Sequence, residues 1–113
     1  MFGYILKRAL LTLLLLSPCL SWAADAYWID VRTAEEYAAG HVSQAVNIPY
    51  EEIAGRIGEV TSDKDAVIYV YCRSGRRSGI AKQALDGAGF THVTNAGSLE
   101  SAMKKAAERS AVQ

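Results

Sequence analysis

Short hydrophobic runs alternate along the chain with segments in which hydrophobic residues recur at helical spacing. The runs at 27–31 and 66–71 are rich in aromatic and β-branched residues, and the second is apolar throughout. Such runs are typical of strands that are buried on both faces of a parallel sheet. We therefore predict strands at both places, with 66–71 in the middle of the sheet, and a last short strand at 92–96.

Helical patterns lie between these strands. Thr33, with Glu36 three positions later, predicts a capping box at the start of a helix that stops at Gly40. The spacing of hydrophobic residues predicts further helices at 51–57, from a cap at Ser78 to about Gly87, and at 98–108. This alternation predicts an α/β fold, a single domain with a mostly parallel central sheet and helices on both of its faces.

The first 23 residues have the pattern of a secretory signal peptide. Lys7 and Arg8 precede the apolar run 9–16, and Ser21-Trp22-Ala23 is a small-x-small cleavage signal. The run is too short to span a bilayer. We expect cleavage after Ala23 or Ala24, a mature domain at 24–113, a periplasmic location and no stable membrane association after cleavage. Lipid attachment at Cys19 is the alternative, although Pro18 stands where a lipobox needs a small residue.

The charge and the cysteine content limit which partners and which uses of cysteine are expected. The chain has 12 basic and 12 acidic residues, and loss of Lys7 and Arg8 leaves a net charge of −2. Such a balance gives no indication of a nucleic-acid partner. The two cysteines are Cys19, which leaves with the signal peptide, and Cys72. The mature domain therefore has one thiol and forms no internal disulfide.

Cys72 begins a loop that follows the predicted central strand, at the end of the sheet where active loops of such folds lie. A helix amino terminus and nearby guanidinium groups both lower the pKa of a thiol. Gly75 allows a tight turn in which the backbone N–H groups of 73–78 form an anion nest. Such a nest stabilises a thiolate, a persulfide or a bound oxyanion. The alternative interpretation of Cys72 is an inert thiol buried at the end of a strand.

The number of residues between Cys72 and Arg77 distinguishes sulfur transfer from phosphate chemistry. Four residues lie between Cys72 and Arg77. Phosphatases that use a cysteine thiolate have one residue more in this interval, so the loop is too tight for phosphate. The sequence here resembles the rhodanese family. The resemblance covers residues 27–99 and includes Ile29-Asp30-Val31-Arg32, Glu36-Tyr37, Gly40-His41-Val42, Ala45-Val46-Asn47-Ile48-Pro49, Val70 to Ser78 and Asn95-Ala96-Gly97. Gln44 and Ser98 stand where the family usually has glycine.

The resemblance implies a three-layer rhodanese-like fold and a thiosulfate:cyanide sulfurtransferase. Cys72 would be the catalytic residue and would carry sulfane sulfur as a persulfide to cyanide or another thiophilic acceptor. The expected substrate-binding residues are Arg73, Ser74, Gly75, Arg76, Arg77 and Ser78. Their arginines would attract a small anionic sulfur donor such as thiosulfate. The resemblance does not indicate which thiophilic molecule accepts the sulfur.

Asp30 and Arg32 are expected to have a structural role near the site. The chemistry requires neither a metal nor an organic cofactor, and none is expected. Two alternatives remain open. One is a non-catalytic sulfane-sulfur carrier or sensor that serves a protein partner, and the other is a cysteine-dependent phosphatase or arsenate reductase.

Overall fold

Four parallel strands form the central sheet, in the spatial order β2-β1-β3-β4. The computed structural model describes residues 25–112, so the predicted signal peptide and Cys19 lie outside the described residues. The helices and strands follow one another as β1 (Ala26–Asp30), α2 (Ala34–Ala39), β2 (Val46–Asn47), the 3₁₀ turn η2 (Tyr50–Glu52), α3 (Ile53–Arg56), the 3₁₀ turn η3 (Ile57–Glu59), β3 (Val67–Tyr71), α4 (Arg76–Gly87), β4 (His92–Asn95) and α5 (Leu99–Val112).

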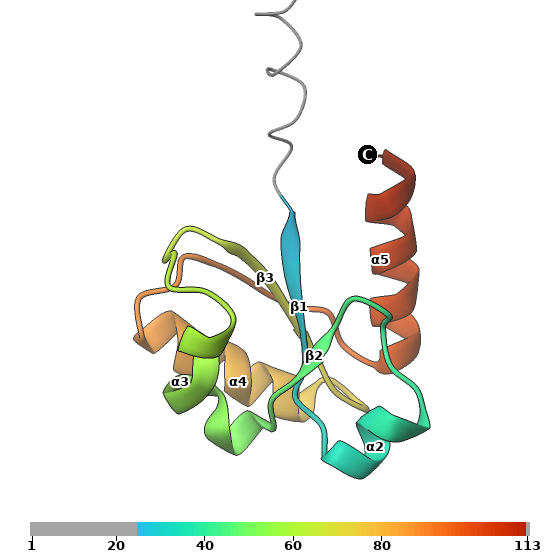
Figure 1. Cartoon of the computed structure of the whole chain (residues 1–113), viewed down its shortest axis with the longest axis horizontal. Coiled ribbons are helices and arrows are strands. Elements are labelled where there is room, and N and C mark those ends of the chain that lie inside the picture. Colours follow the sequence, from blue (N-terminus) through green and yellow to red (C-terminus); the bar gives the residue numbers. More distant parts are fainter. Residues whose placement is uncertain (1–24, 113) are drawn as a thin grey trace, which may run out of the picture.

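The two strongest predicted strands form the centre of the sheet. β1 and β3 pair in parallel along five residues, from Ala26 opposite Val67 to Asp30 opposite Tyr71. β2 and β4 lie on the outer sides of this pair. Because all four strands are parallel, their carboxyl ends lie at one end of the sheet, and α2, α4 and α5 all begin there (Figure 1).

Side chains alternate between two hydrophobic cores, one on each face of the sheet. On one face Ile68 and Val70 of β3 pack with Leu85 of α4 and Ile53 of α3. On the other face Tyr71 packs with residues of α2 and α5. Figure 1 shows α3 and α4 on one side of the strands and α2 and α5 on the other. The predicted α/β fold with helices on both faces is therefore confirmed.

The start of α4 differs from the prediction. Gly75, not Ser78, is the N-cap, and it has a φ of 94° in the left-handed region that favours glycine. The tight turn at Gly75 brings the chain into the helix at Arg76. Ser78 consequently lies in the first turn and is fully buried, so its hydroxyl faces the loop instead of capping the helix.

The rest of the chain differs from the prediction in smaller ways. The predicted helix 51–57 is divided into η2, the four-residue helix α3 and the start of η3. The segment 45–48, to which the sequence pattern assigns neither helix nor strand, contains the two-residue strand β2. α5 continues to Val112, beyond the predicted end at 108. Gln44 and Ser98, which replace the family's usual glycines, have negative φ angles, as do all other described residues except four glycines. The backbone at these two positions is therefore compatible with a side chain.

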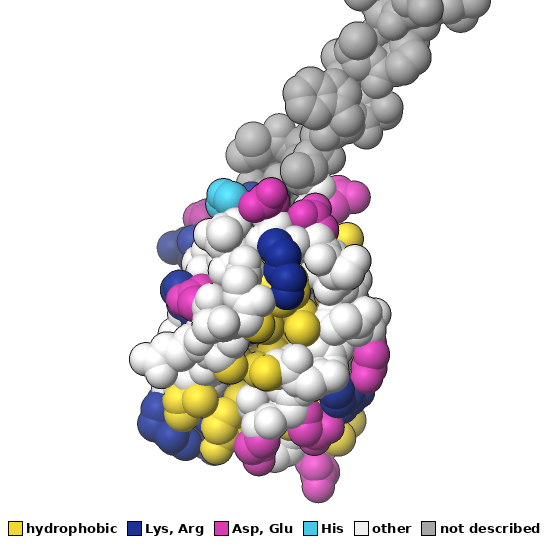
Figure 2. Space-filling model, turned by 90° about the vertical axis from the view of Figure 1, so that its left-hand side faces the viewer, with side chains coloured by type: hydrophobic (Ala, Val, Ile, Leu, Met, Phe, Trp, Pro, Cys, Tyr) yellow, Lys and Arg dark blue, Asp and Glu magenta, His cyan; other side chains and the backbone are white. Residues whose placement is uncertain are grey.

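Figure 2 shows the side of the molecule where α3 and α4 lie. Acidic and basic side chains are interspersed there among hydrophobic ones, and no large area carries one sign of charge. None of the helices within residues 25–112 is long and apolar enough to cross a membrane.

Candidate active site

The Cys72 loop lies at the carboxyl end of β3, between the central strand and α4. The Cys72 N–H donates to the Gly97 carbonyl at 3.0 Å, which fixes the start of the loop against the segment after β4. The sulfur accepts a hydrogen bond from the Gly75 N–H at 3.0 Å and lies 3.4 Å from the Ser78 hydroxyl oxygen. Cys72 is the only free cysteine of residues 25–112, and it has no exposed surface.

The pKa of the Cys72 thiol reflects two opposing effects. Burial raises the pKa, because it disfavours the charged thiolate. Hydrogen bonds from the Ser78 hydroxyl and from the N–H groups of Ser78, Ser74 and Gly75 lower it, and together they bring the pKa from 9.0 to about 7. A large fraction of Cys72 is therefore thiolate at neutral pH, although the sulfur is shielded from water.

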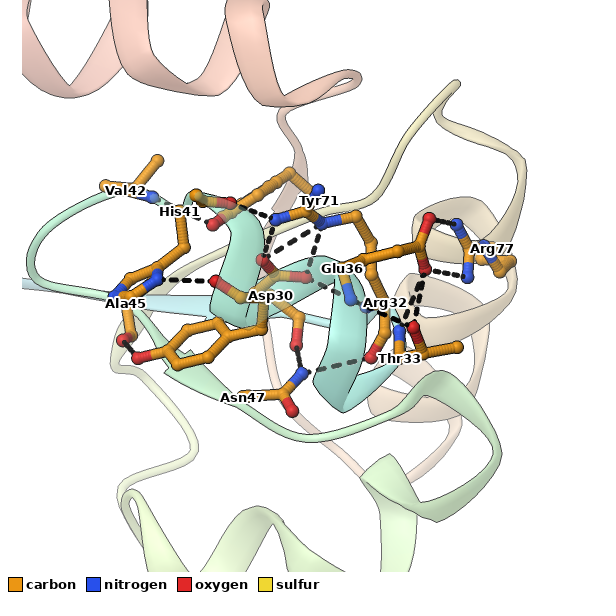
Figure 3. Close-up of polar contacts among 12 residues, drawn as sticks. Asp30, Arg32, Thr33, Glu36, His41, Val42, Ala45, Asn47, Tyr71 and Arg77 are labelled. Carbon is orange, nitrogen blue, oxygen red and sulfur yellow. Dashed lines mark hydrogen bonds and ion pairs between the residues drawn. The ribbon is translucent and has the colours of Figure 1, made fainter.

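The three arginines of the loop have different surroundings. Arg73 and Arg76 are exposed. Arg77 is partly buried and forms two hydrogen bonds with the Glu36 carboxylate of α2, from Nη1 to Oε1 at 2.9 Å and from Nη2 to Oε2 at 3.0 Å (Figure 3). The Arg77 guanidinium, and then the Thr33 N–H, lower the pKa of Glu36 to about 2. The charge of Arg77 is thus balanced, whereas those of Arg73 and Arg76 face solvent.

Asp30 and Arg32 form a buried ion pair beside the loop (Figure 3). Arg32 Nε lies 2.9 Å and 3.0 Å from the two carboxylate oxygens, and Nη2 lies 2.6 Å from Oδ2. Arg32 Nη2 also donates to the Gly40 carbonyl. The Asn47 side-chain amide donates to the backbone carbonyls of Asp30 and Arg32. These contacts join the end of β1 to the end of α2 and to β2.

A surface cavity of about 480 Å³ opens next to the loop. Arg32, Arg73 and Glu36 line one part of it, and Leu99 and Glu100 at the start of α5 line another. The cavity therefore adjoins the loop at Arg73, whereas the Cys72 side chain packs in the core with residues of α3 and α4.

His41 makes a local packing contact with Tyr37 of α2. The His41 ring stacks on Tyr37 with 3.6 Å between ring centres, and Nδ1 lies 2.8 Å from the Tyr37 carbonyl, to which it donates. Residues 25–112 contain no group of three or more His, Cys, Asp or Glu side chains with the geometry to hold a metal ion.

Two residues of the site were not among the predicted site residues. Glu36 pairs with Arg77 although its position after Thr33 indicates only a capping box, which it also forms. Asn95 bonds to both Ser78 and Gly75. Asn95 belongs to a motif of the family resemblance, but that pattern alone does not distinguish a site residue from a turn residue.

The fold and site define a class of protein: a parallel α/β domain with an activated, buried cysteine in a nest of backbone N–H groups. The family model described as Rhodanese-like domain matches residues 19–105. The chain belongs to the rhodanese family.

Individual relatives agree with this assignment. The chain is 46% identical over 94 residues to Thiosulfate sulfurtransferase PspE of Escherichia coli K12, a match that covers 83% of this chain and 89% of the relative. The predicted signal peptide and the motifs of the sequence together resemble this relative. A sulfurtransferase of Allochromatium vinosum is 39% identical over 80 residues, which are 71% of this chain and 73% of the relative.

Solved structures give the same result. A structure described as rhodanese with anions from E. coli has a TM-score of 0.66 and 47% identity, and the match covers 68% of this chain and 91% of that one. The predicted rhodanese-like fold and the sulfurtransferase class are therefore confirmed.

Proposed function

We propose that this chain is a thiosulfate sulfurtransferase that carries sulfane sulfur on Cys72 as a persulfide. The observation that carries the proposal is the position of the Cys72 sulfur among the Ser78 hydroxyl and the N–H groups of Ser78, Ser74 and Gly75, which together lower the thiol pKa to about 7. The similarity to an enzyme described as Thiosulfate sulfurtransferase PspE supports thiosulfate as the donor.

The reaction requires only the thiolate as a nucleophile. The Cys72 thiolate attacks the outer sulfur of thiosulfate, a new S–S bond forms, and the bond to the inner sulfur breaks with its electron pair leaving on sulfite. The negative charge of the thiolate then resides on the outer sulfur of the persulfide. A thiophilic acceptor such as cyanide attacks that outer sulfur and forms thiocyanate, and the electron pair of the S–S bond returns to Cys72 as thiolate. No proton is transferred in either step.

The loop residues have distinct roles in this proposal. The exposed Arg73 and Arg76 attract the thiosulfate dianion, and the N–H groups of Ser74, Gly75 and Ser78 hold the sulfur charge. Arg77 stabilises negative charge near the sulfur and is itself oriented by Glu36. The Cys72 side chain is buried among these groups, which shield the sulfur from bulk water.

The location of the enzyme rests on the amino-terminal segment. Lys7, Arg8, the apolar run and the cleavage signal support export to the periplasm and a mature domain at 24–113. Fractionation of cells that express the full chain tests this. A shortened protein in the periplasmic fraction is expected, and a chain of full length retained in the cytoplasm contradicts it.

Activity measurements distinguish this function from the alternatives. Thiosulfate and cyanide are expected to yield thiocyanate with the wild type and not with Cys72→Ser, whereas an aryl phosphate is not hydrolysed. Hydrolysis of the phosphate would indicate a phosphatase. A persulfide that forms from thiosulfate but turns over with a protein thiol and not with cyanide would indicate a sulfur carrier.

A further inference from the structure

The Ser78 hydroxyl lies between two hydrogen-bond acceptors and has a single proton. Its oxygen is 2.7 Å from Asn95 Oδ1 and 3.4 Å from Cys72 Sγ. A hydroxyl donates one hydrogen bond at a time, although it accepts others. Ser78 is fully buried, so water does not supply a second donor. The proton therefore points either to Asn95 or to the sulfur.

The orientation of the Asn95 amide is determined by two contacts besides Ser78. Its Oδ1 accepts the Gly97 N–H at 2.9 Å, and its Nδ2 donates to the Gly75 carbonyl at 2.9 Å. A reversed amide would place NH₂ against an N–H and oxygen against a carbonyl. The atom that faces Ser78 is therefore the oxygen, which is an acceptor only, and Asn95 competes with Cys72 for the hydroxyl proton.

We propose that Asn95 is a positioning residue that acts through Ser78: it accepts the hydroxyl proton when the Cys72 sulfur is uncharged and loses it to the sulfur when the sulfur is a thiolate. A charged acceptor forms the stronger hydrogen bond, and 3.4 Å suits a bond to sulfur. An uncharged sulfur is a weak acceptor, so the 2.7 Å bond to Asn95 then prevails.

This inference rests on the proposed function when it is applied to catalysis. In the resting thiolate the Ser78 proton points to Sγ. When the new S–S bond forms, the negative charge moves to the outer sulfur, Sγ becomes a neutral sulfur, and the proton turns to Asn95. Return of the electron pair to Sγ reverses the change. Asn95 thus stabilises the persulfide relative to the thiolate and favours transfer of sulfur to Cys72.

The charged groups around the sulfur are kept constant in the test. Arg77 of α4 faces Cys72 and is paired with Glu36 of α2, while Arg73 and Arg76 are exposed on the same loop. These side chains are unchanged in all the variants below. Differences in thiol pKa among the variants therefore report on Ser78 and Asn95.

The test measures the Cys72 thiol pKa in the full chain from the ultraviolet absorbance of the thiolate against pH. Each protein is compared with its Cys72→Ser counterpart, which removes the contribution of Cys19. The four proteins are the wild type, Asn95→Ala, Ser78→Ala and the double variant. Asn95→Ala is expected to lower the pKa by about half to one unit, because the thiolate no longer competes for the proton. In the Ser78→Ala background the same change is expected to have no effect.

A second substitution has the opposite expected sign. Asn95→Asp keeps the acceptor for Ser78 and Gly97 and loses the donor to the Gly75 carbonyl. The carboxylate holds the hydroxyl proton more strongly than the amide oxygen does, so the thiol pKa is expected to rise. The rise includes the effect of the new charge, which persists in the Ser78→Ala background. The proposal requires a larger rise with Ser78 than with alanine at 78, and it remains testable with this variant if Asn95→Ala fails to fold.

Equal shifts in both backgrounds would overturn the inference, because they would show that Asn95 acts only on the shape of the loop. An unchanged or raised pKa in Asn95→Ala would also overturn it. None of these measurements uses a sulfur donor. A persulfide that never forms would therefore contradict the proposed function without affecting this result.

Discussion

The Arg77 guanidinium and the Glu36 carboxylate form a bidentate ion pair that connects α4, beside Cys72, to α2 on the other face of the sheet. The two residues are 41 positions apart in the sequence. Arg77 is 19% and Glu36 27% exposed at the side chain, so the pair is only partly shielded from water. The local charge that a donor dianion meets near the sulfur therefore depends on both residues.

Arg77→Ala is predicted to raise KM for thiosulfate more than it lowers kcat. The substitution leaves the Glu36 carboxylate without its partner, and this charge repels the dianion. A unit charge and a dianion about 8 Å apart in water interact by roughly 1 kcal/mol, which corresponds to about a fivefold rise in KM. Steady-state kinetics at low ionic strength measure this change.

Glu36→Gln provides the control for that prediction. Added to Arg77→Ala, it removes the unpaired charge, and KM is expected to return most of the way to the wild-type value. Alone, it leaves Arg77 unbalanced, and KM is expected to fall. An Arg77→Ala protein with unchanged KM, or a double variant no better than the single one, would contradict this account of the pair.

The rate of Cys72 alkylation by iodoacetamide is predicted to rise with pH and to reach half its maximum at about pH 7. The physical reason is that only the thiolate reacts, and the loop hydrogen bonds lower the thiol pKa from 9.0 to about 7. Because the group loses a proton, reactivity is low at pH 5 and constant above about pH 8. Ser78→Ala removes a donor and is expected to move the midpoint upward. A wild-type midpoint near pH 9 would show that the loop does not activate the thiol.

Much of the fold could be predicted because local patterns determine it. The apolar runs around Ile29 and Ile68 indicate strands buried on both faces, and Thr33 with Glu36 forms the expected capping box. The pattern does not determine which face of a helix is buried. Ile80 and Met103 occur at helical spacing but are 40% and 44% exposed, because the buried faces of α4 and α5 include Ala81 and Ala102 instead.

The site was predictable only in part, because the local sequence determines the loop but not the distant residues that contact it. The position of Cys72 after a central strand and before Gly75 follows from the local sequence. The partners of the loop depend instead on distant segments: Glu36 approaches from α2 and Asn95 from the end of β4. A glutamate three residues after a capping threonine and an asparagine two residues before a glycine both have sufficient local explanations, so neither indicates a tertiary contact.

Arg73→Ala and Arg76→Ala are each predicted to raise KM for thiosulfate at low salt, with less effect at high salt. Both arginines are exposed, so their attraction for the dianion is screened by ions. Lys104→Ala removes a charge of the same sign from an exposed position of α5 and is the matched control. Equal KM changes for Lys104→Ala, or a change independent of salt, would contradict a local role for the two arginines.

Asp30→Asn is predicted to lower the free energy of unfolding by about 3–5 kcal/mol, because it leaves the buried Arg32 charge without its partner. Lys82→Ala disrupts an ion pair with Asp86 that is exposed, and we expect a change of less than about 1 kcal/mol. Urea unfolding followed by circular dichroism measures both. Similar losses for the two variants would show that the Asp30–Arg32 pair does not stabilise the fold.

The most direct test of the central claim is the mass of the intact protein after incubation with thiosulfate and removal of excess reagent. The account predicts a gain of one sulfur atom, which peptide mapping places on Cys72 and which cyanide removes. Cys72→Ser, which retains Cys19, is expected to gain no sulfur. A wild-type protein whose mass is unchanged, or a gain that persists in Cys72→Ser, would contradict sulfur transfer through Cys72.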